Sequence, residues 1–129
     1  MSRIVHFEVH AENPERALKF YGDLFGWQAQ KWDGPQPYWL ITTGPNDKQG
    51  INGGLMMRQG PAPQENQTVN AFVCTVGVDN LDSAMASASK HGGTMVVPRM
   101  LIPGVGWLSY FKDTEGNIFG IYQDDPSAK

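Results

Sequence analysis

The sequence predicts an α+β fold made of two tandem βαβββ modules, each a strand followed by a helix and three more strands. Three observations favour it: strict apolar–polar alternation at residues 4–10, a helix-start signal directly afterwards, and a restart of the same pattern after residue 67. With 129 residues, 40% of them hydrophobic, the chain is long enough for one domain with a core. We expect a single domain at 1–129, with module one at 1–58, a linker at 59–67 and module two at 68–125.

Module one begins with the alternating strand at residues 4–10, in which His6, Glu8 and His10 share one face. Asn13 is a preferred helix cap and Pro14 suits the first helical position, so a helix is expected from here to Gly26, which is typical of a helix end. The remaining strands of the module are expected at 27–32, 37–43 and 51–58.

The linker at 59–67 contains two prolines and no large apolar residue. Module two repeats module one with a shift of about 67 positions, which places Asn80 on Asn13 and Gly93 on Gly26. Its helix is expected from a cap at Asn80 to about His91. Its strands are expected at 69–78, 94–98, 107–112 and 118–123.

The composition excludes several classes of partner. A net charge of −3 argues against nucleic acid and anionic membrane surfaces, because both require a concentrated basic surface. The apolar runs are only a few residues long, too short to span a bilayer. The single cysteine, Cys74, has no partner for an internal disulfide, so we expect a cytoplasmic protein.

Five short segments resemble one known superfamily: NPERA at 13–17, FY at 20–21, FGW at 25–27, GVGW at 104–107 and DTEGN at 113–117. They are similar to the opening and closing units of the vicinal oxygen chelate superfamily. That group includes lactoylglutathione lyase (glyoxalase), extradiol dioxygenases and bleomycin resistance proteins. The resemblance covers nearly the whole chain. It implies curled mixed sheets around a shared cleft, and a homodimer.

The metalloenzymes of this superfamily take one ligand from the first strand and one from the fourth strand of each module. The resemblance assigns these four positions to His6, Gly53, Val73 and Gly120. Only His6 has a side chain that binds a metal, whereas catalytic zinc sites usually keep three protein ligands. The resemblance therefore implies that the family metal site is mostly lost, so no cofactor is assigned, although a divalent metal stays possible.

Three interpretations of the His6 face stay open. His6 and Glu8 are ~7 Å apart along a strand, close enough to bind one divalent metal together with a third ligand from elsewhere. The same two residues are candidates for a catalytic acid–base pair. Alternatively, His6, Glu8 and His10 form only a solvated polar strand face, as is common on one-sided antiparallel strands. Under the first two interpretations, strand parity predicts ligand-binding residues at His10, Leu55, Met57, Thr75 and Tyr122.

The sequence thus predicts a glyoxalase-like protein that binds a small molecule, or an enzyme that works without a metal. One alternative is a metal-dependent lyase or dioxygenase that uses His6, Glu8 and a further ligand. Another alternative is a drug-sequestering protein of the bleomycin-resistance kind. The residues do not identify the ligand, and they do not decide whether the protein is an enzyme.

Overall fold

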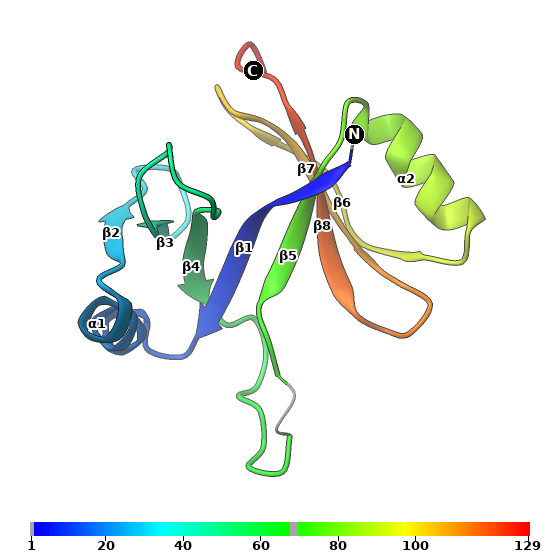
Figure 1. Cartoon of the computed structure of the whole chain (residues 1–129). Coiled ribbons are helices and arrows are strands. Elements are labelled where there is room, and N and C mark those ends of the chain that lie inside the picture. The colour runs from blue at the N-terminus through cyan, green and yellow to red at the C-terminus, as the bar shows by residue number, and fades with distance from the viewer. Residues whose placement is uncertain (1, 68–69) are drawn as a thin grey trace. The chain divides into compact units, whose positions relative to one another are not determined.

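The computed structural model describes residues 2–67 and 70–129. Its elements follow the predicted order of strand, helix and three strands, twice, which gives an α+β fold (Figure 1). The chain divides into two compact units: an N-terminal unit, His6–Phe72, and a C-terminal unit formed by residues 2–5 together with Val73–Lys129. No helix in the described part of the chain is long and apolar enough to cross a membrane.

The N-terminal unit contains the sheet order β2-β3-β4-β1, in which β1 and β4 are parallel and the other pairs are antiparallel. A parallel pair requires a long crossover, and α1 with the two intervening strands supplies it. The elements are β1 (Arg3–Ala11, whose first three residues group with the C-terminal unit), α1 (Pro14–Phe25), β2 (Gln28–Lys31), β3 (Tyr38–Thr42) and β4 (Gly53–Met57).

Helix α1 begins and ends where the sequence predicts. The Asn13 side chain accepts a hydrogen bond from the Arg16 backbone N–H at 3.1 Å, which satisfies one of the unpaired donors of the first turn. At the other end Gly26 takes the left-handed conformation, with φ of 73°, and its N–H donates to the Gly22 carbonyl.

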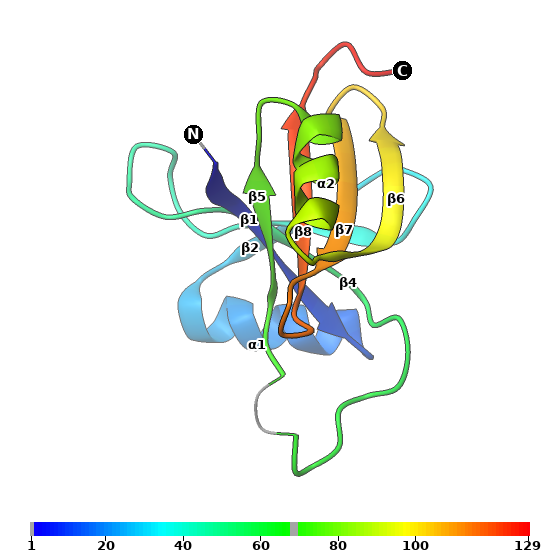
Figure 2. The same cartoon turned by 90° about the vertical axis from the view of Figure 1, so that its right-hand side faces the viewer.

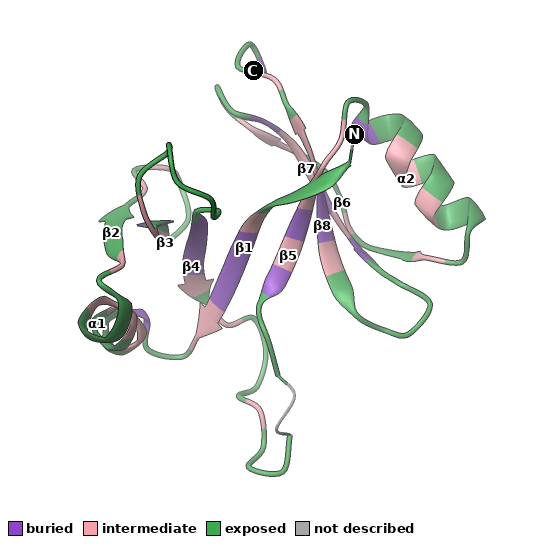
Figure 3. Ribbon diagram, viewed as in Figure 1, coloured by how far each residue is buried: buried purple, intermediate pink, exposed green. Residues whose placement is uncertain are grey.

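The core of the N-terminal unit lies between α1 and one face of its sheet. Phe7 and Val9 from β1, Ile41 from β3 and Leu55 from β4 are buried there. Within this unit, Figure 3 shows buried stretches along β1 and β4. Alternate residues of β1 supply this core, because successive strand side chains point to opposite faces. The other face of β1 therefore carries His6, Glu8 and His10.

The C-terminal unit contains β5 (Val73–Gly77), α2 (Leu81–Lys90), β6 (Thr94–Ile102), β7 (Gly106–Lys112) and β8 (Ile118–Asp124). Its sheet order is β5-β8-β7-β6. Helix α2 covers one face of β7 and β8, as Figure 2 shows, and Leu81, Phe111 and Ile121 are buried beneath it. Asn80 caps the helix by accepting from the Ser83 N–H at 2.9 Å.

Two strands of this unit, β5 and β6, differ from the predicted bounds by more than one residue. Strand β6 continues past Pro98 to Ile102, and register shifts interrupt its pairing with β7 between Met95 and Met100. Proline is tolerated because β6 is the edge of this sheet, and the irregular register accommodates the missing N–H. Strand β5 begins at Val73, and the start predicted for it, at 69, lies outside the described residues.

Candidate functional site: a hydrogen-bonded network on the first strand

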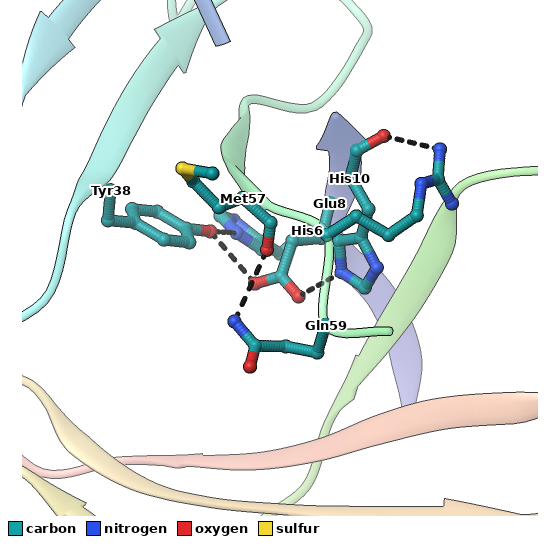
Figure 4. A network of polar contacts seen from close by, with 7 residues as sticks. His6, Glu8, His10, Tyr38, Met57 and Gln59 are labelled. Carbon is teal, nitrogen blue, oxygen red and sulfur yellow. Dashed lines mark hydrogen bonds and ion pairs between the residues drawn. The ribbon is translucent and has the colours of Figure 1, made fainter. Parts of the chain in front are cut away.

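A chain of polar side chains lies on the β1 face opposite α1 (Figure 4). His6 Nε2 is 2.8 Å from the Tyr38 hydroxyl oxygen, and that hydroxyl donates to Glu8 Oε2 at 3.1 Å. His10 Nε2 is 3.1 Å from the second Glu8 oxygen, Oε1. Strand β1 supplies three of these residues at alternate positions, and Tyr38 comes from the start of β3. The four side chains form the His6–Tyr38–Glu8–His10 network, called the network below.

The direction of the hydrogen bonds follows from the chemistry of the groups. An ionised carboxylate only accepts, so the single Tyr38 hydroxyl proton goes to Glu8. The Tyr38 oxygen must then accept from His6, which requires the proton of His6 to be on Nε2. His10 likewise donates from Nε2 to Glu8. The arrangement assigns an Nε2–H tautomer to neutral His6 and leaves its Nδ1 as an acceptor.

Burial differs sharply along the network. Glu8 is only 6% exposed, and both of its carboxylate oxygens have hydrogen-bond partners. Burial lowers the pKa of His6, and the negative charge of Glu8 opposes that shift only in part. His6 is therefore neutral near pH 7. A neutral imidazole with a fixed tautomer can accept a proton at Nδ1, which has no hydrogen-bond partner within residues 2–67 and 70–129.

Gly54 makes the position of Tyr38 possible. Strand register pairs Gly54 with Glu8 on one side and with Leu40 on the other. A Cβ built on Gly54 would lie 1.8 Å from the Tyr38 hydroxyl oxygen and 2.1 Å from the ring carbon that carries it. The phenol ring thus occupies the space that any side chain at residue 54 would need.

The register corrects the predicted family position by one residue. Gly53 pairs with Phe7, and a Cβ there would meet the Phe7 ring at 2.7 Å, so Gly53 belongs to the core face. Gly54 is the residue that faces the network. In the C-terminal unit Gly120 pairs with Thr75, in the way that Gly54 pairs with Glu8. The one-residue difference matters because a slip of one position moves a strand residue to the opposite face.

The same correction applies to Leu55. The prediction that Leu55 shares a face with Glu8 is wrong, because Leu55 pairs with Val9 and is fully buried in the core, at 0% exposure. The prediction for Met57 is wrong in the same way: Met57 pairs with Ala11, which puts it on the Leu55 side of β4 rather than the Glu8 side, and 46% of its surface is exposed. The Met57 carbonyl accepts from Gln59 Nε2 at 3.3 Å, as Figure 4 shows beside the network.

Thr75 and Tyr122 both lie in the C-terminal unit. They come from the paired strands β5 and β8, and the register places them on the face opposite the core beneath α2. The Tyr122 hydroxyl is 2.9 Å from both the Val105 carbonyl and Asp124 Oδ1. Burial, followed by the Asp124 hydrogen bond and charge, raises the pKa of Tyr122 to about 12, so this phenol is a hydrogen-bond donor at neutral pH.

The network does not fit a three-ligand metal centre. Within the described ranges 2–67 and 70–129, no group of three or more His, Cys, Asp or Glu side chains is placed to hold a metal ion. His6 Nε2 directs its proton at Tyr38, and the Tyr38 ring fills the space next to Gly54 from which a fourth-strand ligand would project. A catalytic zinc usually requires three protein ligands, which the network does not supply.

Sequence reasoning brought His6, Glu8 and His10 together correctly but missed Tyr38. Parity within β1 is a local property, so the shared face of the three residues follows from alternation alone. Tyr38 is distant in sequence, and its approach depends on the β3–β4 register. The one available signal was a tyrosine at the start of a predicted strand together with consecutive glycines at 53 and 54.

Comparison with known proteins places the chain in a family. Residues 3–121 match the sequence model of the Glyoxalase/Bleomycin resistance protein/Dioxygenase superfamily, and the chain belongs to that superfamily. It is similar to a glyoxylase-like domain-containing protein of Didymella fabae, with 28% identity over 123 residues that cover 92% of this chain and 91% of the relative.

Solved structures share the fold at low identity. A methylmalonyl-CoA epimerase from Mycobacterium tuberculosis is 13% identical, with a TM-score of 0.67, over 95% of this chain and 88% of that chain. Another structure of a methylmalonyl-CoA epimerase is 15% identical, with a TM-score of 0.62, over 95% and 94% of the two chains. At these identities the likeness concerns the fold.

Proposed function

We propose that the chain is a glyoxalase-like protein that binds a small molecule beside the network and moves a proton without a metal. The observation that carries the proposal is the Tyr38 hydroxyl, which lies within hydrogen-bond distance of both His6 and Glu8. In this proposal neutral His6 accepts the proton at Nδ1, and the buried Glu8 carboxylate stabilises the imidazolium that forms. Glu8 itself is too enclosed to reach a substrate atom.

The related solved structures suggest a first probe. Epimerisation requires the movement of a proton at a carbon atom, and two of the structures with this fold are named as methylmalonyl-CoA epimerases. We therefore propose to incubate the full chain with methylmalonyl-CoA and with a panel of small 2-oxo acids in D₂O. Proton exchange is then followed by NMR, with and without a chelator.

The proposal expects exchange of at least one compound, unchanged by chelator and lost in His6→Gln. Gln keeps an N–H that can reach Tyr38 but cannot accept a proton at neutral pH. His91→Gln is the matched control, because His91 lies at the exposed end of α2 in the other unit. Exchange that requires stoichiometric Zn²⁺ or Ni²⁺ would favour the metal-dependent alternative. The absence of both exchange and any ligand-induced rise in melting temperature would overturn the proposal.

A further inference from the structure

Tyr38 has a role that neither the family match nor the strand alternation assigns. We infer that Tyr38 is a positioning residue that occupies the space of a residue-54 side chain and fixes His6 in the Nε2–H tautomer, an inference that rests on the proposed function. Whatever the substrate, the inference states that the ring proton of neutral His6 is on Nε2 and points at the Tyr38 oxygen.

The first step of the argument is geometric. The Tyr38 oxygen lies 2.8 Å from His6 Nε2 and 3.1 Å from Glu8 Oε2, and it has one proton to donate. Because the carboxylate takes that proton, the imidazole must supply the other. The orienting group of a general base commonly acts in this way, by holding the proton on one ring nitrogen so that the other stays an acceptor.

The second step concerns how the tyrosine is held in place. Its ring makes an edge-on contact with Trp32, with ring centroids 6.4 Å apart, and lies roughly parallel to the His6 ring at 6.5 Å. Backbone pairing of β3 with β4 sets Tyr38 opposite Met56, two register positions beyond the Leu40–Gly54 pair and so on the same face of the sheet. The missing side chain at 54 is thus what allows the phenol to cross β4 and reach β1.

The third step is charge. The network has one buried carboxylate, which both Tyr38 and His10 approach with donors. Every hydrogen bond in the network is therefore directed towards Glu8, and reversing the His6 bond would turn the single Tyr38 proton to His6 and away from Glu8 Oε2. Hydrogen bonds to an ionised acceptor are about twice as strong as neutral ones, so this direction is strongly preferred.

The test is nitrogen NMR of the histidine rings in the full chain, above pH 7, where His6 is neutral. The His6 signals are identified by their absence from the spectrum of His6→Gln. In the wild type they are expected to show a protonated Nε2 and an unprotonated Nδ1. Tyr38→Phe removes the acceptor, and both ring-nitrogen resonances of His6 are expected to shift towards each other as the tautomers mix. Gly54→Ala displaces the same ring and is expected to give the same shift.

Gly44→Ala is the matched control, because a Cβ at Gly44, in the neighbouring β3–β4 connection, meets nothing within 4 Å. It is expected to leave the His6 resonances at their wild-type positions. A wild-type His6 protonated on Nδ1, or an unchanged tautomer in Tyr38→Phe, would overturn the inference; if Gly54→Ala fails to fold, Tyr38→Phe alone decides. Proton exchange without a fixed tautomer would refute this inference and leave the proposed function standing. A fixed His6 tautomer without proton exchange would support this inference and count against the proposed function.

Discussion

Tyr38 and Gly54 share one space: the phenol oxygen of Tyr38 lies only 1.8 Å from where a Cβ of residue 54 would be. The relationship links two neighbouring strands to a buried carboxylate on a third, because the same oxygen donates to Glu8. The register places Gly54 opposite Glu8, one position beyond the Gly53 that the resemblance assigned. The first two predictions test this relationship.

Tyr38→Phe is expected to destabilise the protein by about 1–3 kcal/mol, because Glu8 Oε2 and His6 Nε2 each lose a partner in a partly buried site. The free energy of unfolding is measured with urea. Tyr21→Phe is the control, since within the described residues the Tyr21 hydroxyl has no hydrogen bond, and its change is expected within about 0.5 kcal/mol. Equal losses in the two variants would contradict the assignment.

Gly54→Ala is expected to cost about 1–3 kcal/mol, because the added methyl group displaces the Tyr38 ring. In a Tyr38→Ala background the ring is gone and the cost of Gly54→Ala should fall, giving a coupling energy of about 0.5–3 kcal/mol. Urea denaturation of the four proteins in this cycle measures it. Additive costs would show that something other than Tyr38 excludes the side chain.

His6 should make the protein less stable in mild acid. Burial lowers the His6 pKa in the folded chain below its ordinary value of 6.5. As the pH falls through 6.5 the unfolded chain takes up a proton that the folded chain resists, so stability is lost from there down to the folded-state pKa. Between about pH 7 and about pH 5, His6→Gln should lose less stability than wild type.

The control for this pH dependence is His10→Gln. Tyr38, Glu8 and His10 are the other titratable residues of the network, and His10→Gln leaves the His6 titration in place. As the pH is lowered from about 7 to about 5, the melting temperature of His10→Gln should therefore fall, whereas that of His6→Gln should change less. Identical slopes for wild type and His6→Gln would contradict the prediction.

Leu55 should act through stability rather than through ligand binding. Leu55→Ala is expected to cost about 2–5 kcal/mol, because it opens a cavity in a fully buried position beside Ile41 and Phe7. Met57→Ala, at a position 46% exposed, should cost under about 1 kcal/mol. Thermal and urea denaturation give both values. A small effect of Leu55→Ala would contradict its position in the core.

Asp124 should contribute to the high pKa of Tyr122. Burial is the larger cause and Asp124 the smaller, so Asp124→Asn is expected to lower the Tyr122 pKa from about 12 part of the way towards 10. Tyrosinate absorbance during alkaline titration measures this, and Tyr122→Phe identifies the transition. An unchanged midpoint in Asp124→Asn would show that burial alone is responsible.

Local signals in the sequence were sufficient for the elements and the superfamily. Alternation at 4–10 predicted β1 and the shared face of His6, Glu8 and His10, and the Asn13 and Asn80 caps predicted both helix starts. These features depend on neighbouring residues, so they can be read without knowing how distant segments pair. The repeated order of elements, and the superfamily that it resembles, were identified on the same basis.

Only the tertiary structure decided which glycine faces the network, which face Leu55 takes and where Tyr38 goes. All three depend on how β4 aligns with two other strands: β1, which is more than thirty residues away in sequence, and β3, to which β4 is joined by a loop. A strand has a side-chain period of two, so an error of one residue in that alignment exchanges its two faces. The sequence therefore determined the strands and the polar face of β1. The pairing between strands determined that Tyr38 is the residue that contacts this face.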